Sequence, residues 1–268
     1  MVRPVLDINH IAKTFNPGLI TEKKALIDVD LHLEPGDFVT VIGGNGAGKS
    51  TTLNAVAGVF PVDQGSIIID GKDVTSLPEY KRAQYLGRVF QDPMTGTAPT
   101  MNIDENMALA LRRGKRRGLR WGITNFEREM FREQLSRLGL GLEDRLSSKV
   151  GLLSGGQRQA LTLLMATMRT PKLLLLDEHT AALDPKTAEK VLDITGKIIA
   201  EQNLTTMMIT HNMNDAIAMG NRLIMMNEGR VVVDVRGEEK KKLTREDLME
   251  LFAKAAGKEL SGDRLLLS

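Results

Sequence analysis

The chain has 268 residues, 42% hydrophobic and 26% charged, which is enough for a packed core in one large domain or two small ones. Its net charge is +2, which does not indicate strong nonspecific electrostatic attraction to nucleic acid. It has no cysteine, so disulfides and thiolate metal sites are excluded. No apolar run approaches the roughly 18 residues that span a bilayer, and the N-terminus lacks a signal peptide's apolar region, so we expect at most peripheral membrane association.

The first third of the chain has the pattern of strands separated by turns. Apolar and polar side chains alternate from Ile27 to Leu33, which predicts a half-buried strand, and the run FVTVIG predicts a buried one. We expect strands over residues 27–33, 38–43, 66–74 and 86–91, the third entering a hairpin at Asp70 and Gly71. A helix over 49–58, closed by Gly58, lies between the second strand and the third.

From about residue 92 to 165 the pattern is helical. Thr124 and Glu127 have the spacing of a capping box, and the helix that they open should end at Gly139. The alternating pattern then returns, which predicts an α/β core interrupted by a helical insert. We expect strands over 172–177 and 204–210, a helix over 185–203, and a hairpin over 221–235 that turns at Glu228 and Gly229.

A glycine-rich stretch, GGNGAGKS, runs from Gly43 to Ser50 between a predicted strand and a predicted helix. Glycines let the backbone fold around phosphates, so that consecutive N–H groups and the helix N-terminus face the anion. Lys49 would then reach the β- and γ-phosphates, and Ser50 would offer its hydroxyl to Mg²⁺. The alternative is a glycine-rich turn that matches by chance. The predicted phosphate-binding residues are Gly43, Gly44, Asn45, Gly46, Ala47, Gly48, Lys49, Ser50 and Thr51.

Two acids, Asp177 and Glu178, follow the leucine run at 173–176. In P-loop ATPases a buried strand beside the P-loop strand delivers an aspartate to the Mg²⁺ shell, and Asp177 has that position. The chain bends where the strand ends, so Glu178 can reach the same site and polarise the attacking water. Two carboxylates this close need Mg²⁺ and Lys49 beside them. The alternative is that Glu178 only caps the next segment.

A second helix start with phosphate-binding chemistry lies at LSGGQRQ, residues 153–159. Ser154 is suited to cap this helix, and Gly155 and Gly156 let an anion approach the backbone. One ATP does not need two such sites from one subunit. Two subunits arranged head to tail would explain both sites, because each would complete the nucleotide site of the other.

Six motifs stand in order along the chain: GGNGAGKST, VFQD, LSGGQRQ, LLLLDE, AALD and ITH. Their order and spacing resemble the ATPase subunits of ABC transporters over about residues 5–235. The resemblance implies an α/β fold, a P-loop NTPase with a RecA-like core, an antiparallel β subdomain and a helical ABC insert. It divides the chain into a core of 1–91 with 166–240, an insert of 92–165 and a short helical tail of 241–268.

The resemblance also implies roles for single residues, with ATP and Mg²⁺ as the bound species. Phe15 resembles the aromatic side chain that stacks on adenine; a core phenylalanine is the alternative. Gln91 resembles the glutamine that contacts Mg²⁺ or water and links the nucleotide to the insert. His211 resembles the switch histidine that contacts the γ-phosphate, and Asp184 an aspartate at the dimer interface. The γ-phosphate of an ATP held by the partner subunit would be bound by Ser154, Gly155, Gly156 and Gln157.

These implied roles form two sets. The catalytic residues would be Lys49, Gln91, Glu178 and His211, and the metal ligands Ser50, Gln91 and Asp177.

His179 departs from the family, because most relatives have proline at this position. Proline fixes φ and has no N–H, whereas histidine restores a donor. We expect His179 to shape the turn; a role in proton transfer is the alternative.

The partners follow from the resemblance. It implies a homodimer of ATPase subunits on the cytoplasmic face of the cell membrane, bound to an integral membrane permease and served indirectly by an extracytoplasmic solute-binding protein. No nucleic acid is expected. The stretches GTAPTMNIDENMALA, RRGKRRGLRWG and LLLLDEHTAALDP are similar to importer ATPases assigned to tryptophan or tyrosine. The alternatives are an exporter ATPase, or a non-transport ATPase that acts on nucleic acid or a protein complex.

The run RRGKRRGLRWG at 112–122 places six basic residues beside Trp121 within the insert. One hypothesis is contact with the permease's cytoplasmic loops or with anionic headgroups, where each charge contributes about 1 kcal/mol. A nucleic-acid patch is the rival interpretation, and a solvated loop is the third.

Overall fold

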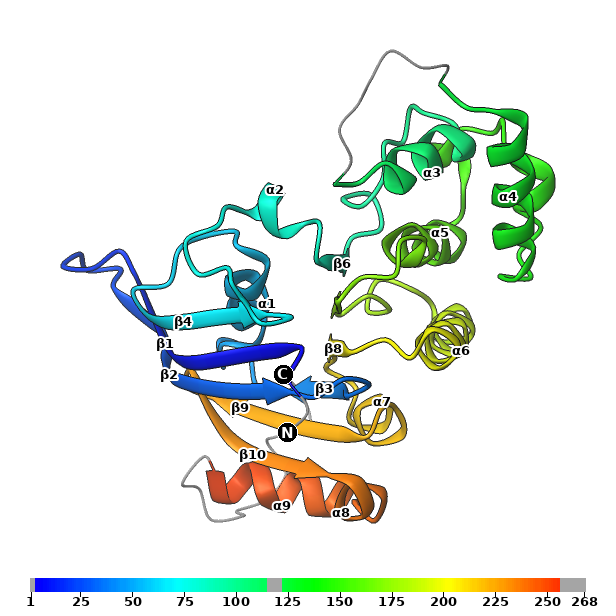
Figure 1. Ribbon diagram of the computed structural model, residues 1–268. Coiled ribbons are helices and arrows are strands. Elements are labelled where there is room, and N and C mark those ends of the chain that lie inside the picture. Colours follow the sequence, from blue (N-terminus) through cyan, green and yellow to red (C-terminus); the bar gives the residue numbers. More distant parts are fainter. Residues whose placement is uncertain (1–2, 115–121, 256–268) are drawn as a thin grey trace.

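The computed structural model describes residues 3–114 and 122–255, and its strands form two sheets (Figure 1). The larger sheet has six strands in the order β10-β9-β3-β8-β7-β6. Neighbours from β9 to β6 run parallel, and β10 is antiparallel at the edge. The bounds are β3 Phe38–Ile42, β6 Leu86–Val89, β7 Leu173–Asp177, β8 Thr206–Ile209, β9 Arg222–Asn227 and β10 Arg230–Arg236. The expected α/β class with a parallel core sheet and a separate antiparallel sheet is confirmed.

The smaller sheet is antiparallel, with the order β2-β1-β4-β5. Its strands are β1 Leu6–Phe15, β2 Lys23–Leu33, β4 Gln64–Ile69 and β5 Lys72–Asp73. The hairpin at Asp70 and Gly71 is confirmed, since both residues have positive φ between β4 and β5. The predicted alternation holds for Val29, Leu31 and Leu33, which are buried, but it fails before Asp28.

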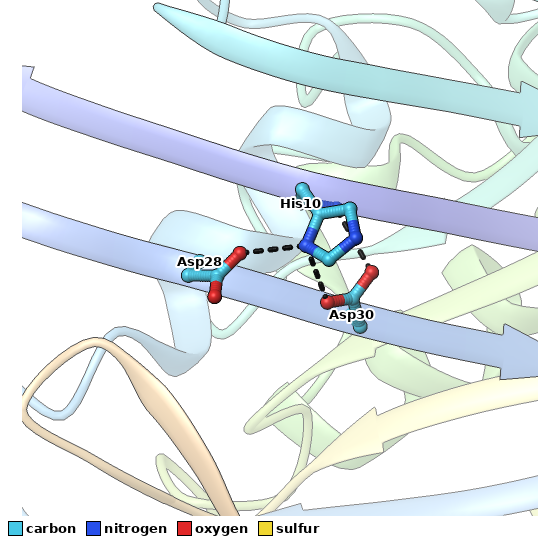
Figure 2. A group of neighbouring side chains, drawn as sticks. All are labelled: His10, Asp28 and Asp30. Carbon is cyan, nitrogen blue, oxygen red and sulfur yellow. Dashed lines mark hydrogen bonds and ion pairs between the residues drawn. The ribbon is translucent and has the colours of Figure 1, made fainter.

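A bulge at Asp28 and His10 explains this failure. Both residues have positive φ, 55° and 49°, and the β1–β2 register shifts between Ile8 and Ile11. The imidazole Nδ1 of His10 lies 2.7 Å from Asp28 Oδ1 and 2.9 Å from Asp30 Oδ2, as Figure 2 shows. The hydrogen bond to Asp28, and then the charges of both carboxylates, raise the pKa of His10. A bulge inserts one extra residue and shifts the side-chain alternation of the strand.

Helices cover the larger sheet on both faces. Alternate leucines of β7 therefore enter different cores: Leu173 and Leu175 pack in the core shared with α1 and the smaller sheet, whereas Leu174 and Leu176 pack against α5 and α6. This explains why the strand has four leucines in a row, since a strand buried on both faces needs no polar side. The helices outside the insert are α1 Lys49–Ala57, α2 Glu79–Arg82, α6 Pro185–Gln202, α7 Met213–Ala218, α8 Gly237–Lys241 and α9 Arg245–Ala255.

The segment after β6 is helical, as predicted, and its green helices lie together at one side of the molecule (Figure 1). Its elements are α3 Ile103–Leu111, α4 Asn125–Ser136, η1 Glu143–Arg145, η2 Val150–Leu152 and α5 Gly155–Thr167. Thr124 and Glu127 form the predicted capping box. The predicted end at Gly139 is wrong, because α4 ends at Ser136 and the backbone then tightens into i+3 turns at Leu138 and Gly139. Among the described helices, none has the length and apolarity needed to cross a bilayer.

Candidate active site

The loop from Gly43 to Ser50 joins β3 to α1 in a conformation that depends on glycine. Gly43, Gly46 and Gly48 have positive φ. A β-carbon on Gly43 would lie 2.2 Å from the carbonyl oxygen of Met226, so the neighbouring strand leaves no room for a side chain. The backbone of the loop is thereby free to curve around an anion at the start of α1.

Lys49 lies across this loop. Its Nζ donates hydrogen bonds to the carbonyl oxygens of Gly43, at 2.7 Å, and Gly44, at 3.1 Å. Burial lowers the pKa of Lys49, and the nearby carboxylates of Glu178 and Asp177 oppose that shift. The sheet thus brings one buried cation and both predicted acids into the same electrostatic neighbourhood.

Asp177 is the last residue of β7 and faces the start of α1. The hydroxyl of Ser50 donates to Asp177 Oδ1 over 3.4 Å. Burial raises the pKa of the Asp177 carboxyl, and Arg88, the Ser50 hydroxyl and Lys49 counteract it. A hydroxyl and a carboxylate side by side are oxygen donors of the kind that Mg²⁺ prefers.

Glu178 turns toward the same edge because its backbone is left-handed, with φ of 46°. Its Oε1 lies 2.5 Å from Nε2 of His211, which follows the end of β8. The N–H of Glu178 donates to the carbonyl of Ile209 at 3.0 Å, which fixes the bend. The predicted bend after the strand therefore exists, and it joins Glu178 to His211 in a pair that the sequence spacing alone did not specify. A carboxylate held this way by an imidazole can accept a hydrogen bond from a water molecule.

Two further residues lie on β6 or just beyond it. Val89 pairs with Leu176 in the parallel ladder, so Gln91 leaves its strand at the same sheet edge as Glu178, and it is exposed. Arg88 is a site residue that the sequence reasoning missed. Its guanidinium lies 4.5 Å from the centre of the Phe90 ring and donates to Asn54 Oδ1 at 2.5 Å. The available signal was a basic residue inside an otherwise apolar strand.

Phe15 ends β1, where it pairs with Lys23 at the start of β2. Its ring is half-buried and meets Phe60 edge to face, with centroids 5.1 Å apart. Lys23 in turn reaches the phosphate loop: its Nζ would lie 3.4 Å from a β-carbon on Gly46. The smaller sheet therefore places Lys23, the ladder neighbour of Phe15, beside the phosphate loop.

Comparisons with known proteins decide the family. The ABC transporter family pattern matches residues 26–181, more than half of the chain. This chain belongs to the ABC transporter family. A relative described as a tyrosine transport ATP-binding protein, from Clostridioides difficile (strain R20291), is 45% identical to this ABC transporter ATPase, over 92% of this chain and 98% of the relative. The spermidine/putrescine import ATP-binding protein PotA of Haemophilus influenzae (strain ATCC 51907 / DSM 11121 / KW20 / Rd) is 32% identical over 87% of this chain, which spans 58% of that relative.

Solved structures agree with the family assignment. The ATP-binding cassette MJ0796, as a dimer bound to ADP and Pi after hydrolysis, superposes with a TM-score of 0.73 at 31% identity, covering 86% of this chain and 98% of that one. The ADP conformation of MJ1267, an ATP-binding cassette of an ABC transporter, gives a TM-score of 0.76 at 27% identity, over 93% and 98%. This ABC transporter ATPase therefore binds ATP or ADP and hydrolyses ATP.

In this ABC transporter ATPase the signature motif, LSGGQRQ at residues 153–159, does not lie at the phosphate loop of residues 43–50. Ser154 caps α5, accepting from the N–H of Gln157, while the Gln157 side chain accepts from the N–H of Ser154. α5 packs on the face of β7 opposite to α1, because Leu174 and Leu176 pack with α5 whereas Leu173 and Leu175 pack with α1. One chain therefore does not bring its two phosphate-binding helix starts together.

Asp184 lies beside the signature motif of its own chain. It caps α6 by accepting from the N–H of Thr187 at 3.1 Å. A β-carbon on Gly156 would lie 2.2 Å from the methyl group of Thr187, and one on Gly155 would lie 3.1 Å from Leu183. The close packing of α5 on α6 explains the two glycines as well as an anion would.

His179 points away from the site. It is 1% exposed, and its Nε2 lies 3.1 Å from the hydroxyl of Thr195 on α6. Burial lowers the pKa of His179 to about 4. A neutral, enclosed imidazole has no route to a reacting water, so the geometry agrees with the structural role that we expect.

The C-terminal helix α9 approaches the phosphate loop from outside the site. Phe252 on α9 packs behind the phosphate loop, where a β-carbon on Gly44 would lie 3.8 Å from its Cζ.

Of the basic run, residues 115–121 lie outside the described residues. Arg112 pairs with Glu127 at 2.9 Å, and Arg113 donates to the carbonyls of Ala166 and Arg169. These two arginines thus bind within the protein itself.

Proposed function

We propose that this chain is the Mg²⁺-dependent ATPase subunit of an importer for an aromatic amino acid. It works as a homodimer on the cytoplasmic face of the membrane, with an integral membrane permease and, indirectly, an extracytoplasmic solute-binding protein. One observation supports the ATPase site. The side chains at one edge of the parallel sheet that lie close together are those of Lys49, Ser50, Asp177, Glu178 and His211. The solute and the direction of transport rest on the relative described as a tyrosine transport protein, supported by the import proteins in the family.

The side chains divide the chemistry among themselves. The phosphate loop and Lys49 bind the phosphates of ATP, and their donors neutralise charge that develops on the γ-phosphate. Ser50 and Asp177, already joined at 3.4 Å, would hold Mg²⁺, whose bound form supplies further positive charge to the phosphates. Gln91, at the same sheet edge, would contact that ion or the attacking water.

Glu178 orients the attacking water and accepts its proton as the oxygen bonds to the γ-phosphorus and the bond to ADP breaks. His211 holds the Glu178 carboxylate in place through the 2.5 Å contact and reaches toward the γ-phosphate. Phe15 stacks on adenine. Residues Ser154 to Gln157 and Asp184 act across the dimer, so ATP closes two sites and hydrolysis reopens them, which moves the permease.

The test of the ATPase site is Glu178→Gln. Without a carboxylate to accept the proton, hydrolysis should fall by roughly 10²- to 10³-fold while ATP still binds. Size-exclusion chromatography with ATP should then show a trapped dimer. Glu189→Gln, which removes an exposed carboxylate from α6, is the matched control. Wild-type turnover in the Glu178 variant would refute the role of Glu178.

The test of transport uses cells that carry or lack this gene. Uptake of labelled tyrosine and tryptophan should fall in its absence, whereas uptake of methionine and spermidine should not. The chain should also co-purify with an integral membrane protein from the wild-type membrane fraction. Unchanged uptake combined with capture of a nucleic acid or of another soluble complex would favour a non-transport ATPase.

A further inference from the structure

Lys23 is a cation for which the established motifs give no role. It begins β2 and its side chain extends over the phosphate loop, where its Nζ would lie 3.4 Å from a β-carbon on Gly46. It also pairs with Phe15 in the β1–β2 ladder. Lys23 therefore lies between Phe15 and the phosphate loop. With adenine on Phe15, the ribose and phosphates of a bound nucleotide would pass through this region.

The nearby charges leave this ammonium group unneutralised. Within residues 3–114 and 122–255, neither an ion pair nor a side-chain hydrogen bond involves Lys23. The adjacent carboxylate, Glu22, accepts instead from the N–H of Gly18 at 2.7 Å. Lys13 is different: its Nζ lies 2.7 Å from Asp63 Oδ1 and 5.7 Å from the centres of both aromatic rings.

An uncompensated cation beside a glycine-rich loop at the start of a helix raises the positive potential of the site. An anion between them is the arrangement that stabilises both. We propose that Lys23 is a nucleotide-binding residue that contacts the phosphate chain from the side opposite Lys49. The inference rests on the proposed nucleotide site and adds to it a second cation that comes from the smaller sheet.

The experiment measures dissociation constants for ADP and for a non-hydrolysable ATP analogue by calorimetry, at low and high salt. Lys23→Gln should weaken binding of both nucleotides by roughly three- to tenfold at low salt, as expected for one partly exposed charge-assisted contact. The difference from wild type should shrink at high salt, because screening weakens an exposed charge.

Two variants make the result specific. Lys23→Arg keeps the charge and should restore most of the affinity. Lys24→Gln removes the neighbouring exposed lysine, which points to the other face of the strand, and should leave binding unchanged. Equal affinities for Lys23→Gln and wild type would overturn the inference, as would equal losses in the two glutamine variants. Because wild-type binding and the Glu178→Gln result are measured separately, failure of the proposed function would be seen independently.

Discussion

His179 illustrates, at the scale of one residue, how a titratable group next to the proposed catalytic carboxylate is enclosed away from the site. The preceding residue, Glu178, turns toward the sheet edge, whereas the imidazole turns into the packing between the strand end and α6. Thr195 donates its hydroxyl proton to the carbonyl of Val191, so it accepts from the imidazole. The sequence could not reveal this contact, because it joins residues on two elements and depends on how α6 packs.

The buried imidazole should make stability depend on pH. An unfolded chain protonates His179 below its ordinary pKa of 6.5, whereas the folded chain does so only near pH 4. Unfolding therefore takes up a proton, and stability falls as the pH drops through that window. Relative to His179→Pro, the wild type should lose about 2 kcal/mol of unfolding free energy between pH 7 and pH 5. Urea unfolding at a series of pH values measures this difference.

The same variant separates structure from catalysis. His179→Pro removes the imidazole and should hydrolyse ATP with nearly the wild-type rate and pH profile. Parallel stability curves for the two proteins would contradict the burial argument. A loss of turnover confined to the imidazole titration range would instead restore the proton-transfer hypothesis.

At the scale of elements, Arg82 at the end of α2 joins α1 to the smaller sheet. It is 2% exposed, and its guanidinium donates hydrogen bonds to four backbone carbonyls. Two of these, Ala55 and Val56, lie in the last turn of α1, the negative end of the helix dipole. The other two, Leu77 and Thr75, lie in the segment after β5. A single guanidinium therefore fixes the helix that carries Lys49.

Arg82→Met should show what this guanidinium contributes. The thioether fills part of the space but leaves buried carbonyls without donors, so unfolding free energy should fall by about 3 kcal/mol. Arg230→Met, on the exposed part of β10, is the control and should change it by less than about 0.5 kcal/mol. Urea denaturation with both midpoint and slope measured would decide. A stability within experimental error of wild type would mean that water replaces the lost donors.

Most elements could be predicted because their signals are local. The leucine run of β7, the capping box at Thr124 and the turn at Glu228 and Gly229 each lie within a few residues, and each element is present. β1 was not predicted, because the bulge at His10 breaks its alternation. The position of Asp177 and Glu178 at the sheet edge could be predicted from their place after a strand. Arg88 and Lys23 could not, because their roles depend on packing between separate strands.

At the scale of the whole molecule, the proposed dimer would divide each nucleotide site between two chains. The phosphate loop and the signature motif lie on different sides of the fold, and MJ0796 has been solved as a dimer bound to ADP and Pi. In the proposed head-to-tail dimer, defects in the two motifs should therefore complement each other. Lys49→Ala removes the phosphate cation. Ser154→Asp keeps the helix cap but places a negative charge where the partner's γ-phosphate would bind.

Each variant alone should be nearly inactive, whereas a mixture should recover hydrolysis. In an equal mixture half of the dimers are mixed, and each mixed dimer has one intact site, so up to roughly a quarter of wild-type ATPase activity should return if sites act independently. Ser154→Asn is the control, because asparagine keeps the helix cap without adding a charge. Activity that stays at the level of either variant alone would contradict the shared-site arrangement.

The position of Phe252 links α9 to the nucleotide site, because a β-carbon on Gly44 would lie only 3.8 Å from its Cζ. α9 lies along the edge of the molecule beside β10 (Figure 1). Its Phe252 side chain nevertheless approaches Gly44, the residue whose carbonyl accepts from Lys49. A small molecule or antibody fragment that displaced this helix would alter ATP affinity without competing with ATP. Fusion partners are for the same reason better attached before β1 than behind α9.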